Sequence, residues 1–266
     1  MSDSLIVSLH SPHLPLPPST PRPPSPLPPA TLRGEAAKRL YLALWLPLLS
    51  ALWAGCFLLA ARFYPSYRIP NHDISDLGDP GMNRHGWWFW SLGMGLAALL
   101  SIPPIAYASR RMHELTLTHP DGGRRLVSMG TISMRCALFG LAGLALVPQS
   151  HHLDALHIVS GVFAMGGAYI TLLYFWGAPL FTVREMSPTR RALITVSAWW
   201  GVAGFLGTQA YRFLAYGEVG HDWKHHGESI LLRFSLWEWL LFAAVTTSFA
   251  LLIALLPERQ DLRADN

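Results

Sequence analysis

Apolar residues gather in six long runs along this chain of 266 residues, and polar segments separate the runs. Each run is long enough to cross about 30 Å of hydrocarbon at a rise of about 1.5 Å per residue. The pattern therefore predicts an all-α integral membrane bundle of six transmembrane helices. We place the spans at Leu40–Tyr64, Gly86–Ala108, Leu126–Val147, Ile158–Phe181, Ala192–Tyr216 and Leu232–Leu256.

The segments outside the spans leave no room for a soluble domain, since the longest loops hold only about 15 to 20 residues. Residues 1–34 are dominated by proline, which neither donates a backbone hydrogen bond nor continues a helix, so we expect a disordered cytoplasmic tail. This stretch lacks the basic start and apolar core of a signal peptide. Residues 35–257 are then the six-helix transmembrane domain, and residues 258–266 a short cytoplasmic tail.

Composition agrees with the membrane interpretation, because 51% of the residues are hydrophobic and only 14% are charged. Cys56 and Cys136 both fall inside apolar runs and form no metal or disulfide motif. The net charge of +4 comes from Lys and Arg that flank the spans, which argues against a nucleic-acid partner.

Topology follows from these flanking cations, which are about twice as frequent at one face of the predicted bundle. Both termini are therefore predicted to be cytoplasmic, and the loops near residues 65–85, 148–157 and 217–231 to face outward. We expect a multi-pass protein of the cell membrane, in the bacterial inner membrane.

Polar and titratable residues are sorted onto the outward loops, which carry eight of the twelve histidines under this topology. Helices begin at these loops, and the partial positive charge of a helix N-terminus favours acidic groups or a bound anion. We predict a polar site formed by the three loops together. Its candidate residues are His72, Asp73, Ser75, Asp76, His151, His152, Asp154, His157, Arg212 and Glu238.

Some of these histidines have spacings that would suit a metal. His151 and His157 lie on one broad face with Asp154 if the segment is helical, and His221 and His225 are one helical turn apart. Imidazoles with one carboxylate form a plausible zinc shell, which could activate water for hydrolysis. An ordinary loop role is the alternative, in which Asp73 or Ser75 caps the start of a short helix or turn.

Two charged residues lie within the spans themselves, where burying a charge costs free energy unless the group is paired or hydrated. Glu238 sits about two turns into the last span and could line the floor of the outer site. Arg135 lies near the middle of the third span.

Tryptophans and small residues in the spans have structural interpretations. Trp87, Trp88, Trp90, Trp237 and Trp239 lie at the outer ends of the second and last spans, where we expect an aromatic belt at the membrane interface. Small residues at one-turn spacing should let helices approach closely. These include Gly140, Gly143, Gly161, Gly166, Gly167, Gly201, Gly204 and Gly207.

The segments ISDLGDP (Ile74–Pro80), GWWFWSLGM (Gly86–Met94) and VPQSHHLDALH (Val147–His157) resemble elements of a known family. They look like the first loop, second helix and Pro-then-His element of the prokaryotic membrane proteins called domain of unknown function 998 (DUF998). A fainter similarity links the IS-x-x-G turn to the eukaryotic Frag1/DRAM/Sfk1 membrane proteins, associated with lipid handling and autophagy. The resemblance covers roughly residues 40–256 and implies about six spans, without implying an activity.

Function remains open between classes at this point. The first hypothesis is a membrane protein whose outward His/Asp-rich pocket binds a lipid headgroup or a small polar ligand. The alternative is a metal-dependent hydrolase that acts on lipid at the outer leaflet, with zinc as the cofactor. A haem-binding electron carrier ranks last, because it would need histidines near both faces of the bundle. The partners in every case include membrane lipid, and the oligomeric state is left open.

Overall fold

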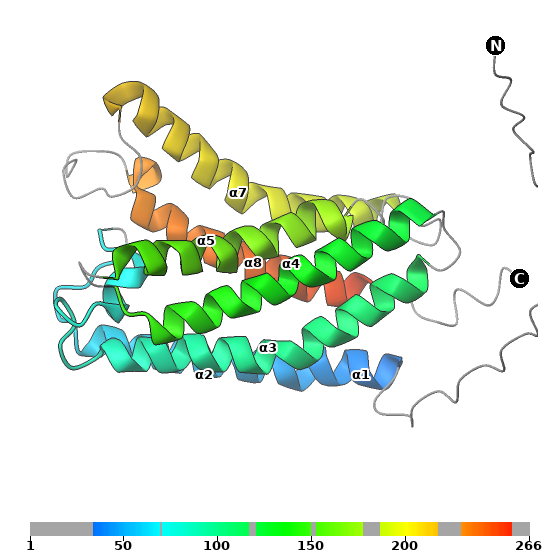
Figure 1. The fold of residues 1–266 in the computed structure, drawn as a ribbon, viewed down its shortest axis with the longest axis horizontal. Helices are drawn as coiled ribbons and strands as arrows, with labels where there is room; N and C mark the ends of the chain where they lie inside the picture. Colours follow the sequence, from blue (N-terminus) through cyan, green and yellow to red (C-terminus); the bar gives the residue numbers. More distant parts are fainter. Residues whose placement is uncertain are drawn as a thin grey trace, which may run out of the picture. The chain divides into compact units, whose positions relative to one another are not determined.

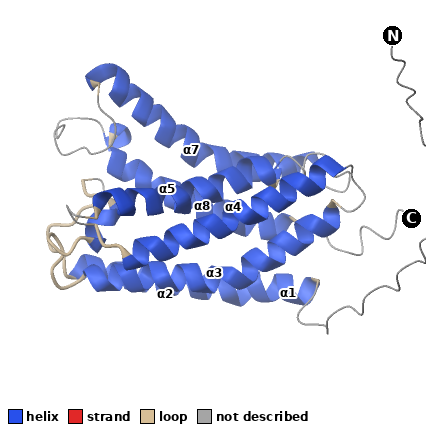
Figure 2. Ribbon diagram, in the orientation of Figure 1, coloured by secondary structure: helices blue, strands red, loops and turns tan. Residues whose placement is uncertain are grey.

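The computed structural model describes residues 34–69, 71–116, 121–149, 153–177, 187–217 and 230–256. Within these ranges the chain is helical and contains no β-strand, as Figures 1 and 2 show. The all-α prediction is therefore confirmed for the part of the chain that the structure describes. The proline-rich tail and His151, His152, His221 and His225 lie outside these residues.

Six long helices make up the described chain. The first is continuous over α1 (Glu35–Leu40), the π-helical turn η1 (Tyr41–Trp45) and α2 (Leu46–Arg62). The others are α3 (Trp87–Leu115), α4 (Asp121–Leu146), α5 (Asp154–Ile170) with the π-helical η3 (Thr171–Phe175), α7 (Pro188–Tyr216) and α8 (Phe234–Leu255). Short 3-10 helices, η2 (Ile74–Gly78) and η4 (Ile230–Leu232), precede α3 and α8.

Five helices in the described residues are long and apolar enough to cross a membrane. They are Ala36–Arg62, Trp87–Leu115, Gly123–Leu146, Asp154–Phe175 and Phe234–Leu255. The protein is accordingly a helical bundle of the multi-pass membrane class. The predicted span Ala192–Tyr216 lies in α7, which has 29 residues but is not among the five. The count of six spans therefore stays a prediction.

Successive long helices run in alternating directions, so their termini lie at two ends of the bundle (Figure 1). Helix α3 packs against α2 and α4, α4 packs against α5, and α7 packs against α8. The start of the first described helix and the end of the last lie at the same end of the bundle. There the Lys38 ammonium donates to the carbonyl oxygen of Leu256 at 3.1 Å. Which end is cytoplasmic stays a prediction.

The proline pair in α3 does not end the helix near the predicted boundary at Ala108, because α3 continues to Leu115. Pro104 has no N–H to donate to the carbonyl oxygen of Leu100, one helical turn earlier. The indole N–H of Trp45 on η1 takes that place and donates to the Leu100 oxygen at 2.6 Å. The Leu100 carbonyl group thus keeps a hydrogen-bond donor where the helix passes through the prolines.

Glycines bring neighbouring helices together at part of the predicted positions. A Cβ on Gly140 of α4 would lie 2.3 Å from the backbone nitrogen of Ala164 on α5. A Cβ on Gly201 of α7 would lie 2.4 Å from the Cβ of Ala244 on α8. The predicted close approach is confirmed at these two glycines. The prediction is wrong for Gly161 and Gly207, where an added Cβ would have nothing within 4 Å.

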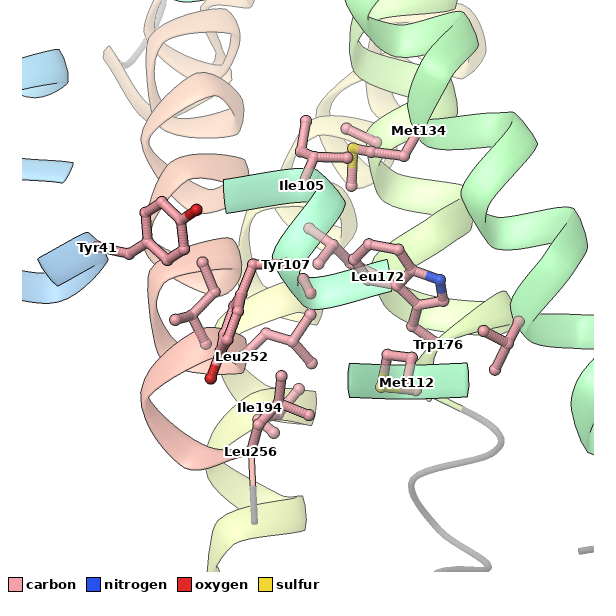
Figure 3. Close-up of a cluster of buried hydrophobic side chains, with 14 of the residues drawn as sticks. Tyr41, Ile105, Tyr107, Met112, Met134, Leu172, Trp176, Ile194, Leu252 and Leu256 are labelled. Carbon is pink, nitrogen blue, oxygen red and sulfur yellow. The ribbon is translucent and has the colours of Figure 1, made fainter. Parts of the chain in front are cut away.

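The largest cluster of buried apolar side chains lies toward the end of the bundle that holds Gly34 and Leu256. Figure 3 shows these side chains converging from several helices. It draws Tyr41 of η1, Tyr107 of α3, Leu172 of η3 and Leu252 of α8 among them. Ile194 brings the start of α7 into the same cluster.

Candidate functional site

The loop between α2 and α3 folds over the other end of the bundle and meets the start of α8. Five side chains at this junction form what we call the polar cap. They are Tyr67, Asp73 and Asp76 from the loop, and Ser235 and Glu238 from the first turns of α8. Asp73 is 4% exposed and Asp76 is 9% exposed, so two carboxyl groups are buried here.

The loop carboxyl groups are positioned by the 3-10 helix η2. Asp73 is its N-cap, with extended backbone, and Asp73 and Asp76 form a reciprocal capping box. The Asp73 N–H donates to Oδ2 of Asp76 at 3.1 Å. The capping role that the sequence suggested for Asp73 is confirmed, and it explains locally why two acidic residues stand three positions apart.

Helix α8 holds this turn from the other side. Glu238 Oε2 accepts the N–H of Ile74 at 2.7 Å, and Ser235 Oγ donates to Asp73 Oδ1 at 2.7 Å. Ser235 and Glu238 are three residues apart and therefore share one face of α8. Glu238 thus accepts an N–H at the N-terminus of η2, where helical N–H groups lack partners within the helix, and Ser235 binds the side chain of the N-cap residue Asp73.

Tyr67 connects the polar cap to the aromatic residues beneath it. Its hydroxyl donates to the carbonyl oxygen of Asp73 at 3.2 Å and accepts the indole N–H of Trp239 at 3.1 Å. Burial raises the pKa of Tyr67, and the nearby carboxylates of Glu238, Asp76 and Asp73 act in the same direction, against the hydrogen bond from Trp239. Tyr67 therefore stays protonated and keeps its role as a donor.

The rest of the loop is tightly packed. A Cβ on Gly78 would lie 2.2 Å from Cδ1 of Trp90, and Trp90 itself is only 3% exposed. Asn83 is fully buried and donates to the carbonyl oxygens of Ala60 and Leu77, at 3.0 Å each. Trp90 fills the space under η2 and so does not face lipid as a residue of an aromatic belt would, whereas Trp88 is 47% exposed.

The remaining predicted site residues have separate surroundings. His72 accepts the N–H of Arg68 through Nδ1 at 3.1 Å and lies beside the rings of Tyr64 and Tyr67. Ser75 is half-buried in η2. The structure thus brings Asp73, Ser75, Asp76 and Glu238 together, with His72 close by in the same loop.

His157 has a different environment from the polar cap. It is buried, and its Nδ1 lies 2.8 Å from the carbonyl oxygen of Val147, so it ties the start of α5 to the end of α4. Asp154 lies half-buried in the first turn of α5. Arg212 belongs to α7, and its side chain is outside the described part of the structure.

A metal site finds no support within the described residues. No group of three or more His, Cys, Asp or Glu side chains there could hold a metal ion. Three of the four predicted ligands, His151, His221 and His225, lie outside those residues. The zinc site and the hydrolase hypothesis therefore stay predictions.

An apolar cavity of about 380 Å³ lies in the bundle between α8 and the helices α2 to α5. This volume is within the roughly 300–1,000 Å³ of small-molecule pockets. Its wall on α8 runs from Trp239 to Phe249, which spans about 15 Å at the helical rise. The polar side chains in its lining are Ser50, Ser101 and Thr246.

Exposure along the lining shows where the cavity opens. Its walls on α3, α4 and α5 include buried residues such as Ala97, Met134 and Ala168. Ser50 on α2 and Thr246 on α8 also line the cavity but are exposed. The cavity therefore opens between α2 and α8. Both residues lie near the middle of their spans, at the depth of lipid chains.

Trp239 belongs to both regions. Its indole N–H bonds Tyr67 in the polar cap, while its ring lines the cavity. The ring also meets Phe57 edge-on, at a centroid distance of 4.4 Å. Sequence reasoning missed the cavity because no local pattern marks it. It depends on how far α8 stands from helices that are far away along the chain.

No protein-family model, curated protein or solved structure matches this chain. The resemblance to the DUF998 proteins therefore stays a prediction. The functional interpretation depends on the polar cap and the cavity.

Proposed function

We propose that this multi-pass membrane protein binds a membrane lipid, with one hydrocarbon chain in the apolar cavity and the headgroup at the polar cap. The observation that carries the proposal is the lining of the cavity. Almost every side chain around it is apolar, so it offers dispersion contacts and little hydrogen bonding. A hydrocarbon chain matches that lining, whereas a small polar molecule inside it would lose its hydrogen bonds to water.

The opening between α2 and α8 supports a ligand that arrives from the bilayer. Ser50 and Thr246 lie at mid-span, about 15 Å from either edge of the hydrocarbon layer. A water-soluble ligand would have to cross that layer to reach the opening. A lipid chain is already at this depth, so it only has to move sideways between the two helices.

The polar cap supports the position of the headgroup. It lies at the end of the bundle where α2 ends and α8 begins, the same two helices that border the opening (Figure 1). A lipid whose chain passes between them would leave its headgroup beside the cap. Carboxylates in that region favour a group that donates hydrogen bonds, such as an amine or a hydroxyl. We propose that this end faces outward.

Photo-crosslinking in vesicles tests the proposal. The probe is a phosphatidylethanolamine that carries a diazirine in one acyl chain, reconstituted with the full-length protein. Crosslinks are expected on the deep wall of the cavity, at Met134 and Met165. Thr246→Trp places a large ring in the opening and should lower these crosslinks about tenfold, equivalent to roughly 1.4 kcal/mol of binding free energy.

The matched control is Thr247→Trp, since Thr247 is also exposed but does not line the cavity. It should leave the crosslinks at Met134 and Met165 unchanged. Crosslinks confined to residues on the exposed surface of the bundle, such as Phe139, which is 79% exposed, would show lipid at the surface only. That result would contradict the proposal.

A further inference from the structure

Arg135 has an unusual position for a charged residue in a membrane span. It lies on α4, within the apolar helix Gly123–Leu146, at twelve residues from one end and eleven from the other. These separations correspond to about 18 Å and 17 Å along the helix. Its side chain is exposed, so it points away from the bundle. Within the described residues no hydrogen-bond or ion-pair partner contacts it.

A guanidinium at this depth needs an anion, because charges within bilayers normally pair or face water. Lipid phosphates lie at the edge of the hydrocarbon layer, about 15 Å from its centre. The five apolar helices in the described part of the chain carry no carboxylate near their middle. Glu238 comes nearest to the middle of a span, and it accepts the N–H of Ile74 at the polar cap. A second copy of this chain therefore has no free carboxylate at the right depth.

The surface around Arg135 suits a neighbouring helix. Ile132 is 60% exposed and Phe139 is 79% exposed, and they lie about one helical turn before and after Arg135. Leu146 continues the same face and is 81% exposed. The buried face of α4 points instead toward α3 and α5, with which it packs. One stripe of α4 thus combines bulky apolar side chains with a single central cation.

We propose that this stripe of α4, centred on Arg135, docks a transmembrane helix of another protein that carries an aspartate or glutamate near its middle. The carboxylate accepts hydrogen bonds from the guanidinium, and Ile132 and Phe139 pack against the partner helix on either side. Charge complementarity selects the partner, since only an acidic group at mid-bilayer depth neutralises Arg135 without deforming the membrane.

A synthetic helix tests this interaction directly. The probe is a leucine-rich transmembrane peptide with one central glutamate, and its companion has leucine at that position. Energy transfer between labelled peptide and labelled full-length protein is measured in phosphatidylcholine vesicles. We expect the glutamate peptide to associate about five- to thirty-fold more strongly than the leucine peptide. Arg135→Leu should remove that preference, and Arg135→Lys should retain most of it.

Arg125→Leu is the matched control, because Arg125 is also exposed on α4 but lies near its end. It should keep the preference for the glutamate peptide. Equal association of both peptides with the unmodified protein would overturn the proposal, as would a preference that survives in Arg135→Leu. Energy transfer between two copies of the protein that depends on Arg135 would also overturn it, in favour of self-association.

Discussion

The polar cap and the apolar cavity lie next to each other, yet they are built in opposite ways. In the cap, each described group is held by directed bonds, such as those of Ile74 to Glu238 and Ser235 to Asp73. Below Trp239 apolar side chains of five helical segments line a cavity of about 380 Å³ without directed bonds across it. The same helix, α8, borders both regions.

This difference shows how a bundle can hold a space open. Fixed contacts at the cap, together with the buried cluster around Tyr107 and Leu252 at the other end, determine where α8 lies. Between these ends Trp53 of α2 stacks on Phe242 of α8 at a centroid distance of 4.7 Å, and both rings line the cavity. The hydrogen bonds at the cap and the buried cluster thus hold α8 on both sides of the cavity.

The largest expected effect is at Gly78, where a single added methyl group would meet Trp90. Because the new Cβ would lie 2.2 Å from the rigid indole, Gly78→Ala should lower the free energy of unfolding by about 3 kcal/mol. Unfolding by titration with a denaturing detergent measures this. Gly55→Ala is the control, since nothing lies within 4 Å of that position, and it should not destabilise the protein. Equal stability of the two variants would mean that the loop beside the polar cap is less tightly packed than the structure shows.

An intermediate effect is expected at Glu238. Glu238→Leu leaves the buried N–H of Ile74 without an acceptor and should cost about 1–3 kcal/mol of unfolding free energy. Glu238→Gln keeps an acceptor oxygen at the same distance along the side chain and should cost clearly less. The same detergent titration compares the two variants. A glutamine variant as unstable as the leucine variant would show that charge, and not the hydrogen bond to Ile74, holds the cap.

The smallest effect on stability is expected in the cavity. Ala243→Leu adds three carbon atoms beside the opening, where space is available. The free energy of unfolding should stay unchanged or rise by up to about 2 kcal/mol, as for other cavity-filling substitutions. A loss comparable to that of Gly78→Ala would remove the contrast between the two regions, because the cavity would then be as tightly packed as the cap.

Sequence reasoning located part of the site for identifiable reasons. Asp73 and Asp76 occupy a local capping pattern, and Glu238 stands out as a carboxyl group inside an apolar span. Placing the loop near residues 65–85 beside the start of the last span brought these groups to one end of the bundle. The histidines were harder to interpret, because His157 bonds the carbonyl oxygen of Val147, a role that residue spacing does not reveal.

Other features depend on contacts that no local pattern contains. Trp90 and Trp239 are of a residue type, and lie at sequence positions, typical of the membrane interface. The folded loop nevertheless buries Trp90, and Trp239 bonds Tyr67 and lines the cavity. Where α3 passes Pro104, Trp45, 55 residues before Leu100, supplies the donor that the proline lacks. Gly140 lies at a helix contact while Gly161 does not, although both occur at small-residue spacing.

By itself the sequence determined the helical class, five long apolar helices and the end of the bundle where Asp73, Asp76 and Glu238 meet. These follow from the hydrophobicity and spacing of neighbouring residues, which act over one or two helical turns. Only the tertiary structure decided that Glu238 binds Ile74, 164 residues away, and that a cavity lies between α8 and the helices α2 to α5. Distances between helices are set by the sum of many side-chain volumes, and no single segment encodes that sum.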